Sequence, residues 1–222
     1  MYIHAIVKFG NQKWMDEFQK GKIHFKQLKQ FQEFEKKHID NAQRGDKYEG
    51  AHIVLSPAQN KIVIGDYTLD SNDLVEPIRT YQDSISKHPI FCLYALTDEI
   101  VESFLNSNRP FLIDSKVQNF GDTAVYITDF KEFLNRFEFA INKQLGIGYS
   151  RGLVEYIDVN EINGEWGAFR KPREYDYQSE YRLLLDSPIN DPSIDLDIGD
   201  ISDITISMPI ESIHTIEIKT KI

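Results

Sequence analysis

The opening part of the chain switches between strand-like and helix-like spacing of its hydrophobic residues. Hydrophobic and polar positions alternate over Tyr2–Phe9, which predicts a first strand. In Asn11–Lys20, and again in Gln27–Lys37, the hydrophobic residues recur at helical spacing, which predicts two amphipathic helices. The short segment between them, Lys22–Phe25, is predicted to be a strand.

The next stretch loses this periodicity. His38–Gly50 is polar and carries two glycines, so we expect a loop there. Two short apolar runs, His52–Leu55 and Lys61–Ile64, are separated by turn-forming residues and predict a β-hairpin. Pro89–Leu96 is continuously apolar over the length of one strand, which predicts a central strand that is buried on both faces.

The rest of the chain adds further strands around one long helix. Asp129 followed by Glu132 resembles a capping box, and it opens a helix predicted to run to about Gln144. The glycine-containing Val159–Arg170 and the acidic Ser187–Asp203 are expected to be connecting loops. The other expected strands are Thr123–Ile127, Gly148–Asp158, Ser179–Leu185, Ile204–Met208 and His214–Lys219. Helices mainly in the first two-thirds, with strands throughout, predict an α+β fold of mixed or antiparallel sheets with flanking helices.

Composition narrows the class of protein. The 222 residues are 41% hydrophobic and 27% charged, which fits a single globular domain spanning 1–222. The formal net charge of −10 repels phosphate backbones, so bulk nucleic-acid binding is disfavoured, and only Arg170, Lys171 and Arg173 form a candidate basic cleft. No hydrophobic run approaches the ~20 residues of a membrane helix and no signal peptide is recognisable, so we expect a cytoplasmic protein that does not engage a membrane.

The sequence lacks the motifs of several common chemistries. Cys92 is the only cysteine, so neither an intramolecular disulfide nor a cysteine-based zinc cluster can form, and its apolar neighbours predict a buried structural thiol. A complete glycine-rich phosphate loop, a GxSxG elbow and an HExxH motif are all missing, and the histidines show no metal-ligand spacing on a helix. We therefore expect no metal site.

Two stretches remain as candidate sites. The first is RGDKYEG at Arg44–Gly50, where dense charge and two glycines suit a loop that bends beside a ligand, or equally an exposed turn stabilised by contacts between Arg44 and Asp46. The second is EYRLLL, where strand alternation places Glu180 and Arg182 on one face. These two residues are either an exposed ion pair or part of a site in which a rigid strand holds a catalytic carboxylate.

At these residues the chain resembles a large group of uncharacterised bacterial and phage proteins related to ADP-ribosyltransferases. Four features carry the resemblance: the strand and aromatic-rich helix in GKIHFKQLKQFQEF, the loop RGDKYEG, the run IFCLYAL, and a basic-aromatic segment that leads into EYRLL. Together they span about residues 1–218. The resemblance implies an ADP-ribosyltransferase-like fold in which a cleft between two small sheets holds NAD as the substrate.

The resemblance also implies roles for individual residues. His4 on the first strand would orient NAD, and Glu180 would stabilise the cation that forms as nicotinamide leaves. The ring that stacks on nicotinamide would be Tyr48 or Phe25. The partners of the diphosphate would be Arg44, Lys171 and Arg182.

The activity implied is transfer of ADP-ribose from NAD to a macromolecule that the sequence does not identify, within phage defence or a toxin system. Two other classes of protein stay open. One is a non-catalytic protein that presents its acidic surface and the RGDKYEG loop to a protein partner. The other is a nuclease in which Asp40, Asp46 and Glu49 bind magnesium, although the net charge argues against a nucleic-acid substrate.

Overall fold

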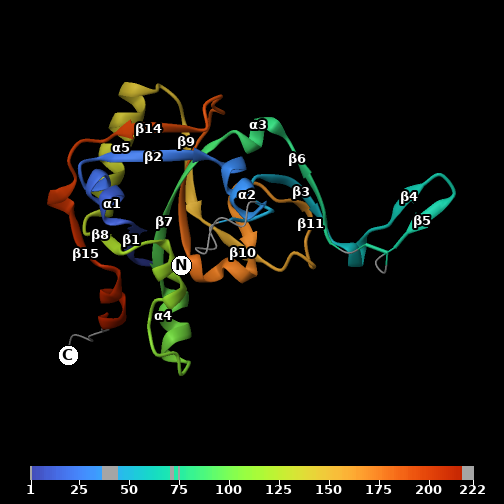
Figure 1. Ribbon diagram of the computed structural model, residues 1–222, viewed down its shortest axis with the longest axis horizontal. Helices are drawn as coiled ribbons and strands as arrows, with labels where there is room; N and C mark the ends of the chain where they lie inside the picture. The colour runs from blue at the N-terminus through green and yellow to red at the C-terminus, as the bar shows by residue number, and fades with distance from the viewer. Residues whose placement is uncertain (1, 37–44, 71–72, 75, 217–222) are drawn as a thin grey trace.

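The computed structural model describes residues 2–36, 45–70, 73–74 and 76–216 and has an α+β architecture (Figure 1). Its centre is an eight-stranded antiparallel sheet with the path β14-β2-β7-β1-β8-β15, to which β13 and β9 are added through β7. The strands of this sheet are β1 (Ile3–Gly10), β2 (Lys22–Gln27), β7 (Pro89–Thr97), β8 (Thr123–Ile127), β9 (Tyr149–Leu153), β13 (Glu180–Leu185), β14 (Ser193–Asp197) and β15 (Thr205–Pro209). The predicted α+β class with antiparallel strands is confirmed.

The two faces of the sheet are covered by different helices. The helices are α1 (Gln12–Gln19), α2 (Leu28–Lys36), α3 (Asp83–Ser86), α4 (Asp98–Leu105) and α5 (Phe130–Gln144). α1 and α5 share the larger hydrophobic core with one face, and α4 packs against the other. α5 begins as the capping pattern predicts, because Asp129 accepts a hydrogen bond from the Glu132 amide at 2.9 Å. Its fully buried Phe133 and Phe137 each stabilise the fold by about 1.5–3 kcal/mol.

Smaller sheets lie beside this body. A three-stranded sheet has the order β11-β3-β6, β10 pairs with β12 in parallel, and β4 pairs with β5 as a hairpin that extends away from the rest of the molecule (Figure 1). Their strands are β3 (Ala51–Leu55), β4 (Ile62–Ile64), β5 (Tyr67–Leu69), β6 (Ile78–Tyr81), β10 (Glu155–Ile157), β11 (Asn163–Glu165) and β12 (Arg170–Pro172). Short 3-10 helices complete the fold: η1 (Pro57–Gln59), η2 (Ser115–Phe120), η3 (Arg173–Gln178), η4 (Ser202–Ile204) and η5 (Ile210–Thr215).

The sheet splits along one edge of its central strand, β7. On one edge, β13 pairs with β7 continuously from Ile90 to Tyr94. On the opposite edge, β1 pairs with β7 from Tyr94 onward and β2 pairs only with Pro89 and Ile90. Among the described residues, no strand pairs with 91–93 on that edge. The two strands therefore diverge and leave an opening in the middle of the sheet.

Several sequence-based predictions of elements differ from the structure. The hairpin of β3 with β4 is wrong, because β3 pairs with β6 and β11 whereas β4 pairs with β5. The expected loops 159–170 and 187–203 contain β11 and β14, each paired with a strand from the first quarter of the chain. The segment expected as a last strand begins within η5, and its residues from 217 onward lie outside the described part. No helix in the described ranges is long and apolar enough to span a bilayer.

Candidate functional site

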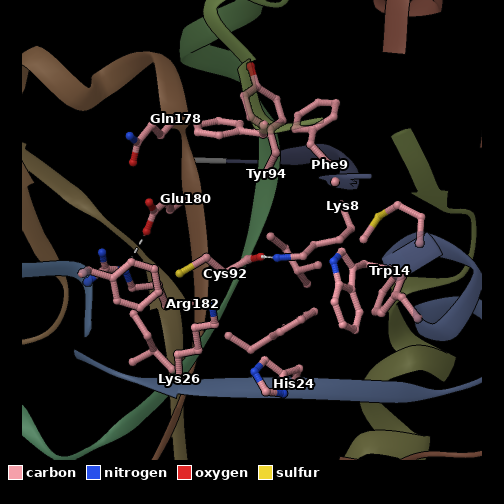
Figure 2. A pocket seen from close by; sticks show the side chains of 18 of the residues that line it. Lys8, Phe9, Trp14, His24, Lys26, Cys92, Tyr94, Gln178, Glu180 and Arg182 are labelled. Atoms are coloured by element: carbon pink, nitrogen blue, oxygen red, sulfur yellow. Dashed lines mark hydrogen bonds and ion pairs between the residues drawn. The ribbon is translucent and has the colours of Figure 1, made fainter. Parts of the chain in front are cut away.

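A cleft of about 650 Å³ occupies the split in the sheet (Figure 2). Its base is the stretch of β7 from Ile90 to Tyr94, and side chains of β1, β2, β13 and α1 surround it. Lys8 reaches into the split from β1 and donates a hydrogen bond from Nζ to the Cys92 carbonyl at 2.6 Å. Because one residue's amide and carbonyl share a strand edge, the Cys92 N–H faces the split as well.

The cleft is less acidic than the molecule that carries it. Five lysine or arginine side chains and four carboxylates line it, whereas the whole chain has a net charge of −10. The cations are Lys8, Lys22, Lys26, Lys171 and Arg182, and the carboxylates are Glu17, Glu49, Glu180 and Asp195. A hollow with one cation in excess, in an acidic protein, favours entry of an anionic ligand of modest size over a long polyanion.

Aromatic rings form part of the wall. Phe9 and Tyr94 meet edge to face with ring centroids 5.5 Å apart, and both line the cleft. Trp14 on α1 also lines it and is 61% exposed. The cleft therefore offers flat apolar surfaces beside its cations, which is the combination that a nucleotide requires.

One end of the cleft holds a buried cluster of four charged side chains from three parts of the chain. Arg182 on β13, which is 0% exposed, binds Glu49 with two hydrogen bonds of 2.7 Å and binds Glu180 through Nε at 2.7 Å. Lys171 on β12 donates to Glu180 at 2.6 Å and lies 3.7 Å from Glu49. Two cations and two carboxylates balance within the cluster, as burial of charge requires.

The cluster fixes the ionisation of its members. Burial opposes ionisation of Glu180, but Arg182 and Lys171 outweigh it and hold the pKa of this carboxyl well below its usual range. Burial alone would lower the pKa of Lys171, yet Glu180 and Glu49 raise it above its usual value. Glu180 is therefore a carboxylate and Lys171 an ammonium at neutral pH.

Glu180 keeps the capacity to bind a ligand. A carboxylate has about four lone-pair sites, and the hydrogen bonds from Lys171 and Arg182 occupy one on each oxygen. The side chain lines the cleft, and Figure 2 shows its carboxylate on the cleft side of β13 next to Arg182. A ligand hydroxyl in the cleft could donate to the remaining sites without breaking the cluster.

The start of β13 is held in an unusual backbone conformation. Ser179 has φ = 38°, and in the described part of the chain it is the only non-glycine residue in the left-handed region. Its side chain donates to the Ala95 carbonyl at 2.6 Å, and its own carbonyl accepts from the Ala95 amide at 2.8 Å. Strained conformations of this kind cost about 1–3 kcal/mol and persist where the surroundings fix them. Here the strained residue directly precedes Glu180.

The loop that supplies Glu49 is fastened at several points. Asp46 accepts from the Tyr48 amide at 2.8 Å, and the Asp46 carbonyl accepts from the Glu49 amide at 3.0 Å. Gln32 on α2 donates to the Glu49 carbonyl, which ties the loop to that helix. Gly50 has φ = 66°, a conformation that favours glycine. Asp46 and Gly50 thus help to hold the loop in the conformation in which Glu49 binds Arg182.

The same loop carries a third buried carboxyl, that of Asp46. Asp46 is fully buried, and its Oδ2 has no hydrogen-bond partner among the described residues. Burial, followed by the nearby charge of Glu49, raises the pKa of Asp46 to about 7. The Cys92 thiol lies among the charges of the cluster, and its pKa is raised to about 12, first by burial and then by Glu180, so it stays protonated and unreactive.

The structure brings together some of the residues selected from the sequence and not others. Glu180, Lys171 and Arg182 meet in the cluster, so the reading of Glu180 and Arg182 as an exposed ion pair is wrong. His4 is exposed, lies edge-on to Tyr2 and does not line the cleft.

The two candidate stacking rings are placed away from the cleft. Tyr48 is buried with its ring 5.5 Å from that of Trp166, and Phe25 is fully buried in the main core. Arg44, and Asp40 of the magnesium hypothesis, lie outside the described residues. Within the described ranges no group of three or more His, Cys, Asp or Glu side chains is arranged to hold a metal ion.

Sequence reasoning missed three features of the site. Glu49 was considered only as a metal ligand, although it is the bidentate partner of Arg182. Lys8 and Trp14 were given no role in a site, since Trp14 was taken only as part of the hydrophobic face of the first helix, yet both line the cleft. A signal for Lys8 was present, since alternation places it on the same strand face as the hydrophobic Ile6, but nothing in the local pattern identifies its acceptor 84 residues away.

Comparison with known proteins identifies no family. No protein-family model, no curated protein and no solved structure matches the chain.

Proposed function

We propose that this protein binds NAD in the cleft of the split sheet and transfers the ADP-ribose group to a macromolecule. The observation that carries the proposal is the position of Glu180, a strand-borne ionised carboxylate in the wall of a cleft of about 650 Å³ that is lined by aromatic rings and by one more cation than carboxylates. The resemblance of the sequence to proteins related to ADP-ribosyltransferases points to the same residue, although it implies a cleft between two small sheets and this cleft lies within one sheet.

The reaction needs a fixed negative charge beside a developing cation. When the bond between nicotinamide and the ribose C1′ breaks, nicotinamide leaves with the bonding electron pair and the ribose becomes an oxocarbenium-like cation. Glu180 would accept a hydrogen bond from a ribose hydroxyl and stabilise that cation, since its charge is held in place before the reaction. A nucleophile of the acceptor would then attack C1′ and lose its proton to water.

The cations of the cleft would hold the diphosphate. Lys8 lies in the middle of the split, and Lys26 belongs to the strand on the other side of it. Lys171 and Arg182 are engaged with carboxylates, so in this proposal they position Glu180 instead of binding phosphate directly. This assignment changes the role that the resemblance implied for them.

The experiment is to measure nicotinamide release from NAD by the wild type, Glu180→Gln and Glu49→Gln. Each variant removes one negative charge from the same buried cluster, so Glu49→Gln reports the structural part of any loss. We expect Glu180→Gln to lose about 10²-fold or more in rate beyond the loss in Glu49→Gln, because it removes transition-state stabilisation. Glu99→Gln changes an exposed glutamate on α4 to glutamine and controls for effects of mutagenesis and purification. Equal losses in the two cluster variants would contradict a chemical role for Glu180.

A protein-binding role is the second candidate, and the β4–β5 hairpin favours it. This hairpin pairs only with itself in the described sheets and extends from the body (Figure 1). Val63, Ile64 and Tyr67 on it are exposed, and exposed apolar side chains that gather on one element are typical of interaction surfaces. The two candidates are compatible, since an enzyme that modifies a macromolecule must also bind it.

A further inference from the structure

Trp14 is an apolar side chain with no role in the core. The hydrophobic face of α1 is supplied by Met15 and Phe18, both buried in the main core, whereas Trp14 is 61% exposed. Leaving a large indole in water forfeits the stabilisation that its burial would give. The indole lines the cleft, so the surface that it leaves open is available to a ligand.

The surroundings of Trp14 are charged. Lys13 lies with Nζ 5.2 Å from its ring, and Lys8 extends between it and Cys92 in Figure 2. Lys22 also lines the cleft and is paired with Glu17. Both side chains of this pair are accessible to solvent, and exposed ion pairs contribute little to stability, so Lys22 can exchange Glu17 for a ligand. An aromatic ring flanked by ammonium groups is suited to a base that carries a phosphate.

We propose that the outer end of the cleft is a purine-nucleotide subsite in which the Trp14 indole stacks on the base. Glu17 follows Trp14 by about one turn of α1, and its carboxylate also lines the cleft, so the phosphates belong deeper in the cleft, beside Lys8. There the Lys8 ammonium is held by the Cys92 carbonyl and lies 4.3 Å from the centre of the Phe91 ring. Base and phosphate thus meet different parts of the wall.

This subsite sets the direction of the dinucleotide, a step that rests on the proposed function. Trp14 and Glu180 lie on opposite sides of the view in Figure 2, with Lys8 and Cys92 between them. With Glu180 at the ribose that carries nicotinamide, the adenine end of NAD extends to Trp14 and the diphosphate passes Lys8. In this arrangement Trp14 of α1 is the ring that stacks on a base of NAD, and that base is adenine instead of nicotinamide.

The test uses the fact that the chain has two tryptophans, of which Trp166 is buried. In Trp166→Phe, the fluorescence reports Trp14 alone. We expect AMP to quench this fluorescence in a saturable manner, and nicotinamide mononucleotide and inorganic phosphate to leave it unchanged. Quenching by nicotinamide mononucleotide but not by AMP would reverse the assigned direction and overturn the proposal.

A second measurement keeps the test independent of the Trp166 change. Calorimetric titration with AMP should show an affinity roughly fivefold or more lower in Trp14→Ala than in the wild type, because base stacking on one ring contributes about that factor. Trp14→Phe should recover most of the affinity. Phe139→Ala removes an exposed ring of α5 that does not line the cleft and should bind AMP as the wild type does.

The outcomes separate this inference from the proposed function. AMP affinity that is unchanged in Trp14→Ala, or equally reduced in Phe139→Ala, overturns the subsite even if nicotinamide release depends on Glu180. Conversely, Trp14-dependent AMP binding without any nicotinamide release keeps the subsite and contradicts the transferase.

Discussion

Arg182 shows how one side chain organises the site. Its guanidinium has five N–H donors in a rigid fork, and they are distributed over Glu49, Glu180 and the Ala168 carbonyl. A lysine at this position could not bind Glu49 in the bidentate manner and reach Glu180 as well. Removing Arg182 would leave two buried carboxylates facing only Lys171, a change of the kind that costs about 3–5 kcal/mol.

Asp46 makes the free energy of unfolding depend on pH. Because its folded pKa is about 7 and an unfolded aspartate titrates near 3.9, the folded state holds an extra proton between these values. The free energy of unfolding therefore falls as the pH rises from about 4 to about 7. Asp46→Asn mimics the protonated form and removes this loss.

We expect the difference in free energy of unfolding between Asp46→Asn and the wild type to shift in favour of the variant by roughly 1–3 kcal/mol between pH 5 and pH 8. Denaturant unfolding at both pH values measures this difference. Asp66→Asn, which changes an exposed carboxylate in the β4–β5 turn, is the control and should show no such dependence. A stability difference for Asp46→Asn that is the same at pH 5 and pH 8 would show that Asp46 is ionised throughout.

At the scale of elements, the sequence predicts those whose pattern is local. β7 is recognisable because its apolar run is continuous, and β13 because its alternation is regular: Tyr181 and Leu183 enter the core while Glu180 and Arg182 face the cleft. β14 was missed because two of the five residues in Ser193–Asp197 are acidic, in a stretch rich in aspartate, and because the segment forms a strand by pairing with β2. Pairing partners are distant in sequence, and no local pattern specifies them.

The same limit applies to the candidate site. Glu180 and Arg182 could be placed on one strand face from their spacing alone. The choice between a surface pair and a buried cluster depends on Glu49, which is 133 residues away from Arg182. The split of the sheet could not be predicted from the sequence either, because it depends on where β1 and β2 stop pairing with β7.

The β4–β5 hairpin carries a prediction about elements. An isolated two-stranded hairpin is marginally stable, so it adds little to the fold. Replacing residues 62–69 with a short Gly-Ser linker should change the melting temperature by less than about 2 °C and leave nicotinamide release unaltered. Thermal unfolding checks this, with Val54→Ala in the buried part of β3 as the comparison, expected to cost about 1–3 kcal/mol. A large loss of stability in the hairpin replacement would mean that the hairpin packs on the body.

At the scale of the whole molecule, charge is distributed unevenly. The net charge is −10, yet the split sheet collects five cations around one cleft, and the buried cluster holds an ionised glutamate at one end of it. The acidic exterior disfavours long nucleic acids, while the cleft suits a small anion with aromatic rings. Helix α1, on one face of the sheet, contributes side chains to the wall of this opening.

The most direct test of the account is a crystal structure of the protein with NAD bound. We expect the dinucleotide in the split beside β7, with a hydroxyl of the nicotinamide ribose within hydrogen-bond distance of Glu180 and the diphosphate beside Lys8. NAD bound elsewhere on the surface, or crystals grown with saturating NAD in which the cleft is empty, would contradict the account.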